Sequence, residues 1–114
     1  MALDSQGRVW FGEHEFGSIG VFDPRTETWK SWRAPAPGGS PIEIYSFNVD
    51  RDDVIWFSHF GANYIGRFDP RTEQFSVYPH KSRPVNCRLM DIDRNGEIWC
   101  AGSGVPQLVR LKVK

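Results

Sequence analysis

The sequence predicts an all-β repeat protein, and two observations carry this prediction. The first is composition: five Trp, eight Phe and three Tyr stand beside eight Pro and eleven Gly, a mixture typical of short strands joined by tight turns. The second is a repeat, because Ile-Gly-Val-Phe-Asp-Pro-Arg-Thr at residues 19–26 returns as Ile-Gly-Arg-Phe-Asp-Pro-Arg-Thr at 65–72, which is 46 residues later. Repeats of this period are typical of solenoids, arrays and propellers.

A shared Trp-centred phrase ahead of these segments confirms the repeat. Val9-Trp10-Phe11 is matched by Ile55-Trp56-Phe57 at the same offset of 46, and each phrase follows an aspartate, Asp4 or Asp50. A shorter third copy, with its aspartate at Asp93 and its tryptophan at Trp99, is displaced by 43 residues from the second. The chain therefore holds about two and a half units, approximately residues 1–40, 41–83 and 84–114.

The first unit reads as a series of short strands. A turn at residues 4–7 precedes expected strands at 8–11, 19–22 and 27–32. Between the last two strands, Asp23-Pro24-Arg25-Thr26 fits a type I turn, because Asp caps backbone donors and Pro presets φ. Residues 34–41 are too rich in Pro and Gly for a sheet interior and end the unit. We expect this unit to lack its innermost strand.

The second unit is expected to form a complete set of four antiparallel strands, at residues 42–49, 54–58, 64–68 and 74–78. In the third unit, residues 85–92 correspond to the first of these strands. Four-stranded sheets repeating every 43 to 46 residues are typical of β-propeller blades, whose faces pack on neighbouring blades. We therefore predict a partial β-propeller of about three blade units of four-stranded antiparallel sheets, with the outer two units incomplete. Trp10, Trp56 and Trp99 are expected to pack between blades rather than to form a ligand cage.

Charge and hydropathy exclude two classes of partner. Fourteen Lys and Arg balance fourteen Asp and Glu without long runs of one sign, so we expect neither nucleic acid nor an anionic membrane as a partner. No apolar run reaches the roughly 20 residues of a membrane span, and the first residues lack the features of a secretion signal. A start so close to the internal Asp4 indicates that an upstream region is missing. A soluble chain is expected and its compartment is open, with the cytoplasm favoured.

The two cysteines are expected on neighbouring strands of the third unit. With a turn centred on Arg94 and Asn95, Cys100 would lie opposite Leu89 and diagonal to Cys87, a spacing of ~7 Å that is too long for a relaxed disulfide. We therefore expect two buried free thiols. No zinc-site spacing, phosphate-binding loop or serine nucleophile motif is present in the sequence.

These motifs resemble the streptogramin B lyase (virginiamycin B lyase) family, and the resemblance covers nearly the whole chain. The matching positions are Asp4, Gly7, Trp10, Phe11, Glu13, Ile19, Gly20, Asp23, Pro24 and Thr26, and then Asp50, Trp56, Phe57, Ile65, Gly66, Arg67, Asp69, Pro70 and Thr72. The resemblance implies a magnesium-dependent lyase with a seven-bladed propeller, which opens a cyclic depsipeptide antibiotic by elimination at its ester. Similar blades also occur in sensor and ligand-binding propellers, because a fold does not dictate a function.

The resemblance also implies a catalytic histidine in a Glu-Pro-His motif and a metal-binding glutamate three residues beyond a blade tryptophan. This chain contains no Glu-Pro-His; Ser40-Pro41-Ile42 and Arg83-Pro84-Val85 stand in the corresponding places. At the positions three residues beyond Trp10, Trp56 and Trp99, only Glu13 is a carboxylate, because the other two are His59 and Gly102. We therefore assign no catalytic residue, no metal ligand and no cofactor to this chain, although a complete propeller of this family would imply Mg²⁺.

A mixed polar rim remains on the same predicted face and is our candidate site for binding a small molecule. We assign substrate binding to Glu13, Glu43, His59, Arg83 and Asn86, with His14 beside them, whereas His80 is taken as a surface residue. Two functions stay open: a non-catalytic fragment of a streptogramin B lyase-like propeller, which we favour, or a small-molecule-binding or sensor module without lyase chemistry. The open blade edges predict a homo-oligomer, most simply a dimer.

Overall fold

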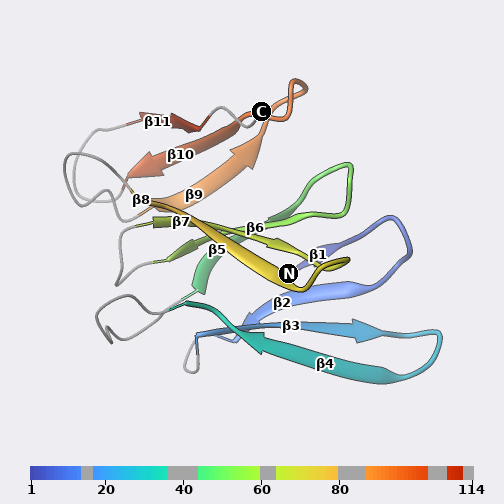
Figure 1. The fold of residues 1–114 in the computed structure, drawn as a ribbon. Coiled ribbons are helices and arrows are strands. Elements are labelled where there is room, and N and C mark those ends of the chain that lie inside the picture. The colour runs from blue at the N-terminus through green and yellow to red at the C-terminus, as the bar shows by residue number, and fades with distance from the viewer. Residues whose placement is uncertain (14–16, 36–43, 60–63, 80–86, 103–107, 112–114) are drawn as a thin grey trace.

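The computed structural model describes residues 1–13, 17–35, 44–59, 64–79, 87–102 and 108–111. These residues form three separate antiparallel sheets of four, four and three strands (Figure 1). In each sheet the strands follow one another in chain order, each pairing with the next. The described part is all-β, and no helix in it is long and apolar enough to cross a membrane. This architecture is the partial propeller that the repeat predicts.

The strands begin and end close to the residues that the repeat indicates. The first sheet contains β1 (Ala2–Leu3), β2 (Val9–Glu13), β3 (Ser18–Asp23) and β4 (Thr28–Arg33). The second contains β5 (Ile44–Val49), β6 (Ile55–His59), β7 (Tyr64–Asp69) and β8 (Gln74–Pro79). The third contains β9 (Cys87–Ile92), β10 (Ile98–Gly102) and β11 (Leu108–Leu111). Trp10, Trp56 and Trp99 lie at equivalent positions on the second strand of the three sheets.

The first sheet differs from the prediction at its inner edge. Strand β1 is only two residues long, yet it pairs with β2 through Ala2 opposite Trp10 and Leu3 opposite Val9. The expectation that this unit lacks its innermost strand is therefore wrong, because the residues ahead of the Asp4 turn supply a short one. Two residues carry too little β pattern to be recognised as a strand.

Adjacent sheets pack face to face through large apolar side chains. Between the first and second sheets, Trp10 and Ile19 are fully buried against Phe57 and Phe68, and the rings of Trp32 and Phe68 lie with centroids 4.7 Å apart. Between the second and third sheets, the buried residues are Val54, Trp56, Ile65, Met90, Ile98 and Cys100. Trp10 and Trp56 thus pack between blades, as predicted, and they do not form a cage.

Polar side chains connect the innermost strands. The amide of Asn48 on β5 donates a hydrogen bond of 2.6 Å to the carbonyl of Met90 on β9, and the Ser46 hydroxyl accepts one of 3.1 Å from the Met90 backbone N–H. The fully buried Ser58 hydroxyl in turn accepts from the Ser46 backbone N–H at 2.8 Å. These bonds satisfy groups that burial would otherwise leave without partners, so they fix how neighbouring blades meet.

The outer face of the first sheet carries an apolar surface that neither of the other two described sheets covers. Phe11 and Phe22 contact Trp29, with ring centroids 5.7 and 4.5 Å away, and Trp29 remains 69% exposed. In the second sheet the equivalent residues, 46 positions later, are Phe57, Phe68 and Phe75, and they pack against the first sheet. The repeat therefore places a blade-packing surface, in the same pattern, on a face that is open here.

The expectation of two free thiols is wrong. Among the described residues no cysteine is free, and Cys100 is disulfide-bonded; the only other cysteine in the sequence is Cys87. In the register of β9 and β10, Cys100 lies opposite Met90 rather than opposite Leu89. A β-bulge between Ala101 and Gly102 then brings backbone position 87 opposite Gly102. The sequence-based geometry assumed a regular ladder, and the bulge changes which positions share one face of the sheet.

Candidate functional site

Each blade is built on one turn in which an aspartate holds a tryptophan. Asp50 Oδ2 accepts a hydrogen bond of 2.9 Å from Trp56 Nε1, while its Oδ1 accepts from the backbone N–H groups of Asp52 and Val54 at 2.8 and 3.0 Å. Asp4 with Trp10 and Asp93 with Trp99 form the same bonds, with Nε1 to Oδ2 distances of 2.9 and 2.8 Å. Each of these carboxylates accepts at least three hydrogen bonds from its own turn and tryptophan, which gives it a structural role.

Hydrogen bonding lowers the pKa of two of these aspartates, Asp4 and Asp93. For Asp93 the hydrogen bond from Trp99 is the main cause, followed by the one from the Glu97 backbone. Burial raises the pKa of Asp4, but hydrogen bonds from Trp10 and Arg8 outweigh burial, so the net pKa lies below its ordinary value. A donor that bonds the charged form of a carboxylate favours that form.

The predicted rim lies at the opposite end of the sheets from these turns. Strands β2 and β6 run away from their Asp turns and end at Glu13 and His59, which therefore share one propeller face, as does Gly102 at the end of β10. Of the five residues assigned to substrate binding, only Glu13 and His59 belong to described segments. Glu43, Arg83 and Asn86 lie outside the described residues, as do His14 and His80.

Glu13 faces the open side of the first blade. It lines a cavity of about 320 Å³ together with Phe11, Trp29, Lys30 and Ser31. Glu13 is on the same side of β2 as Phe11, which is the side away from the second sheet. Among the described residues that line this cavity, Glu13 is the only one that the sequence predicts to bind substrate.

A metal centre of the type implied by the resemblance does not fit the described residues. Described segments contain no group of three or more His, Cys, Asp or Glu side chains placed to hold an ion. Of the three equivalent strand ends, Gly102 has no side chain and only Glu13 offers a carboxylate. Mg²⁺ requires hard oxygen ligands, commonly one or two carboxylates together with water and substrate oxygens.

Tyr64 is a buried polar residue at the rim end of the second blade that sequence reasoning did not identify. It is 2% exposed, and its hydroxyl donates a hydrogen bond of 2.6 Å to the carbonyl of Pro35. Burial raises the pKa of Tyr64 to about 12. Tyr64 therefore stays protonated at neutral pH and links the second blade to the connection leaving the first.

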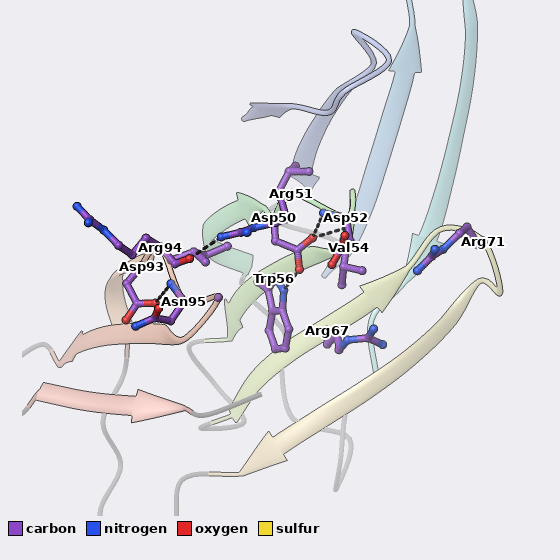
Figure 2. A pocket seen from close by; sticks show the side chains of 13 residues that line it. Asp50, Arg51, Asp52, Val54, Trp56, Arg67, Arg71, Asp93, Arg94 and Asn95 are labelled. Carbon is purple, nitrogen blue, oxygen red and sulfur yellow. Dashed lines mark hydrogen bonds between the residues drawn. The ribbon is translucent and has the colours of Figure 1, made fainter. Parts of the chain in front are cut away.

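A groove of about 720 Å³ lies at the turn end of the sheets, between the second and third blades. Its walls come from the turn that joins β5 to β6 and the turn that joins β9 to β10, with Arg67 and Arg71 from β7 and the turn after it. Figure 2 shows Trp56 between the two sides, with Arg67 and Arg71 on one side and Arg94 and Asn95 on the other. Three apolar residues, Val49, Val54 and Ile92, complete the lining.

Sequence reasoning missed this groove, because its lining residues come from two repeats and their individual motifs are turn motifs. The signal that could have found it is the charge at the turn positions, where arginines occur at residues 51, 67, 71 and 94. Only the sheet packing shows that these arginines line one groove.

The fold and the repeated Asp–Trp turns define the class of protein: a β-propeller, of which this chain forms three blades. More particularly, these blades have the fold of the streptogramin B lyase propeller. Virginiamycin B lyase from Staphylococcus aureus matches with a TM-score of 0.84 and 19% sequence identity, over 98% of this chain and 36% of that chain. A streptogramin B lyase matches with a TM-score of 0.79 and 21% identity, over 98% of this chain and 39% of that chain.

A propeller from another class of protein is also similar. The extracellular domain of a candidate one-component system from B. thetaiotaomicron matches with a TM-score of 0.67 and 20% identity, over 88% of this chain and 12% of that chain. The sequence matches no protein-family model and no curated protein. The chain thus spans less than two fifths of the lyase chains that it resembles.

Proposed function

We propose that this chain is a streptogramin B lyase-like propeller segment that takes part in binding a small molecule and does not catalyse elimination by itself. The observation that carries the proposal is the content of the three equivalent rim positions, Glu13, His59 and Gly102, of which only one is a carboxylate. A base and a metal-held carbonyl must both be present to remove an α-proton. The sequence also has no Glu-Pro-His from which such a base would come.

One solved lyase structure supports a catalytic role for a histidine in the S. aureus enzyme. A catalytically inactive variant of the S. aureus virginiamycin B lyase, in which alanine replaces a histidine, has been solved with quinupristin. In this chain, proline is followed by Ile42 or Val85 where the family resemblance implies a histidine. An aliphatic side chain cannot accept a proton, so ligand binding without turnover is the expected behaviour.

The test is incubation of the purified chain with quinupristin and Mg²⁺, followed by mass spectrometry of the antibiotic. We expect no linear product above the buffer control. Product that accumulates with the chain and disappears on chelation of the metal would contradict the proposal.

A second candidate function is a sensor or binding module with no relation to antibiotics, favoured by the similarity to an extracellular domain of a candidate one-component system. The two candidates differ in what they bind. Thermal shift with quinupristin separates them, since a concentration-dependent rise in Tm supports the lyase-like segment and an unchanged Tm supports the module for another ligand.

A further inference from the structure

We propose that the groove between the second and third blades is a binding site for a small organic oxyanion, a carboxylate or phosphate ester with an apolar body. The groove is at the opposite end of the sheets from Glu13 and His59 and is independent of the function proposed above. Its volume of about 720 Å³ falls within the range of small-molecule sites. The proposal depends on Arg67, on a comparison with the neighbouring groove, and on the groove's other charges.

Arg67 is an arginine held over a tryptophan without an ion-pair partner. In every blade one arginine covers the Asp-bound tryptophan, with distances from guanidinium carbon to ring centroid of 5.6 Å for Arg8, 5.9 Å for Arg67 and 5.5 Å for Arg110. Arg8 pairs with Asp4 at 2.7 Å, and Arg110 lies 3.3 Å from Glu97.

The Glu97 contact is electrostatic rather than a hydrogen bond, because Glu97 Oε2 has no partner in hydrogen-bonding geometry. In the second blade the position equivalent to Glu97 is Val54, which is buried and uncharged. The side chain of Arg67 therefore makes neither a hydrogen bond nor an ion pair with any described residue, although its backbone belongs to β7. Asp69 is near enough for Arg67 to help lower its pKa, yet that carboxylate is already paired with Arg71 at 3.2 Å.

The equivalent groove between the first and second blades is closed where this groove is open. There Asp53 reaches back across the groove, and its Oδ1 accepts a hydrogen bond of 2.8 Å from the Ser5 backbone N–H. The remaining cavity, next to Arg8, Asp52 and Asp53, is only about 200 Å³. In the third blade Gly96 replaces Asp53, and in the second blade Arg67 replaces Val21, 46 residues earlier. Compared with the groove between the first and second blades, the groove between the second and third blades therefore lacks the bridging carboxylate and has an additional guanidinium group.

The charges facing the groove favour an anion. Four arginines, at residues 51, 67, 71 and 94, line the groove together with Asp50, Asp52 and Asp93. Asp50 and Asp93 are each occupied by three N–H donors. Arg51 donates a hydrogen bond to the Arg94 backbone carbonyl. The side chain of Arg94, like that of Arg67, has no hydrogen-bond or ion-pair partner among the described residues. A guanidinium group can donate two parallel hydrogen bonds to the two oxygens of a carboxylate or phosphate.

The lining also indicates what surrounds the charged group of the ligand. Val49, Val54 and Ile92 contribute apolar surface to the lining, which favours a ligand with a hydrocarbon or aromatic part over a bare inorganic ion. The probes are accordingly phenyl phosphate and benzoate, which share one ring and differ in the oxyanion, with inorganic phosphate and phenol as partial ligands.

Isothermal titration of the full chain at low ionic strength tests the site. We expect saturable binding of phenyl phosphate or benzoate with a Kd below about 1 mM, weaker binding of inorganic phosphate and none of phenol. Arg67→Gln should weaken binding at least about tenfold. Arg25→Gln is the matched control, because Arg25 is the 84% exposed equivalent of Arg71 in the first blade and does not line the groove. It should leave the Kd within about twofold.

Gly96→Asp provides a second variant that removes no arginine. Position 96 has φ of 80° and Asp53 adopts φ of 61° at the equivalent place, so an aspartate is tolerated there. Its carboxylate should reach toward Arg51, which is equivalent to Ser5, and weaken oxyanion binding about tenfold. The proposal is overturned if no probe binds saturably up to about 10 mM, or if both Arg67→Gln and Gly96→Asp bind as tightly as the unmodified chain.

Discussion

At the scale of single residues, the molecule depends on three aspartates that each join a turn to an indole. The bonds have the same pattern in all three blades: one carboxylate oxygen accepts from two backbone N–H groups and the other from the tryptophan Nε1. Trp10 and Trp56 are at most 2% exposed, so their indole rings are almost fully enclosed by the protein. An acceptor at this position is therefore a requirement of the buried indole.

Asp50→Ala should destabilise the chain by about 2 kcal/mol, because it leaves the buried Trp56 N–H without an acceptor. Urea unfolding followed by tryptophan fluorescence measures this free energy. Asp52→Ala is the control, since the Asp52 carboxylate has no hydrogen-bonding partner among the described residues, and its effect should stay within about 0.5 kcal/mol. Equal effects of the two substitutions would refute the role assigned to Asp50.

Stability should fall in acid. The pKa values of Asp93 and Glu73 are lowered, in both cases chiefly by a hydrogen bond from a tryptophan, Trp99 or Trp32. A carboxyl group with a lowered pKa in the native state contributes stability that is present above its unfolded pKa, near 3.8 for Asp93. That contribution is lost as the pH falls through the lowered value, because the unfolded chain binds protons first.

Thermal unfolding between pH 6 and pH 2.5 checks this prediction, with the steepest loss of Tm expected below about pH 4. In Asp93→Asn the group no longer titrates, so its Tm should depend less on pH across that window. A variant whose Tm falls as steeply as that of the unmodified chain would argue against a stabilising Asp93 carboxylate.

At the scale of elements, the repeated Ile-Gly of the third strand is explained by close packing. A Cβ added at Gly66 would overlap the ring of Phe57, which is fully buried between the first two blades. The equivalent Gly20 lies under the ring of Phe11, but that ring is on the open face beside the exposed Trp29. The same substitution therefore meets a fixed ring in one blade and a movable ring in the other.

Gly66→Ala should cost about 2 to 3 kcal/mol of folding free energy, within the range of an overpacked core, whereas Gly20→Ala should cost less than about 1 kcal/mol. Parallel urea titrations of the two variants give the comparison. If Gly20→Ala proves as costly as Gly66→Ala, the face that carries Phe11 is covered in solution.

Most of the strand pattern could be predicted from the sequence, because the repeat at offsets of 46 and 43 places turns and tryptophans at fixed positions. Strand β1 and the bulge before Gly102 could not, since a two-residue strand and one extra residue leave no periodic trace. The disulfide-bonded state of Cys100 could not be predicted either, because the register assumed from the sequence has no bulge. The groove could be recognised only from the tertiary structure. The side chain of Arg67 has no carboxylate partner because Val54 occupies the position that is Glu97 in the third blade.

At the scale of the whole molecule, the open face of the first blade carries the residue pattern of an interface between blades. Glu73 in the second blade accepts hydrogen bonds from Lys30 Nζ at 3.0 Å and Trp32 Nε1 at 2.7 Å, both on the first blade. Its equivalent, Glu27, has the same positive φ, 55° against 57°, but no partner in the described structure. The first blade thus offers both the apolar and the polar half of an interface between blades.

We expect the isolated chain to form a homo-oligomer, most simply a dimer, through this face, because an exposed aromatic surface next to unpaired blade edges favours association. Light scattering at micromolar concentration measures the mass. Trp29→Ser should shift the mass toward the 13.1 kDa of a monomer, whereas Val77→Ser, at an exposed apolar residue of the second sheet, should not. An unmodified chain that is monomeric at these concentrations would contradict the expectation.

The central claim is that three successive blades are held by the same Asp–Trp turn, and the exchange of indole protons tests it most directly. In ¹H–¹⁵N spectra the Nε1–H groups of Trp10, Trp56 and Trp99, all bonded to aspartate, should exchange with solvent far more slowly than that of the exposed Trp29. Substitution of each aspartate should accelerate only the indole of its own blade. Exchange of Trp99 as fast as that of Trp29, or insensitivity of the three indoles to their aspartates, would contradict the repeated turn.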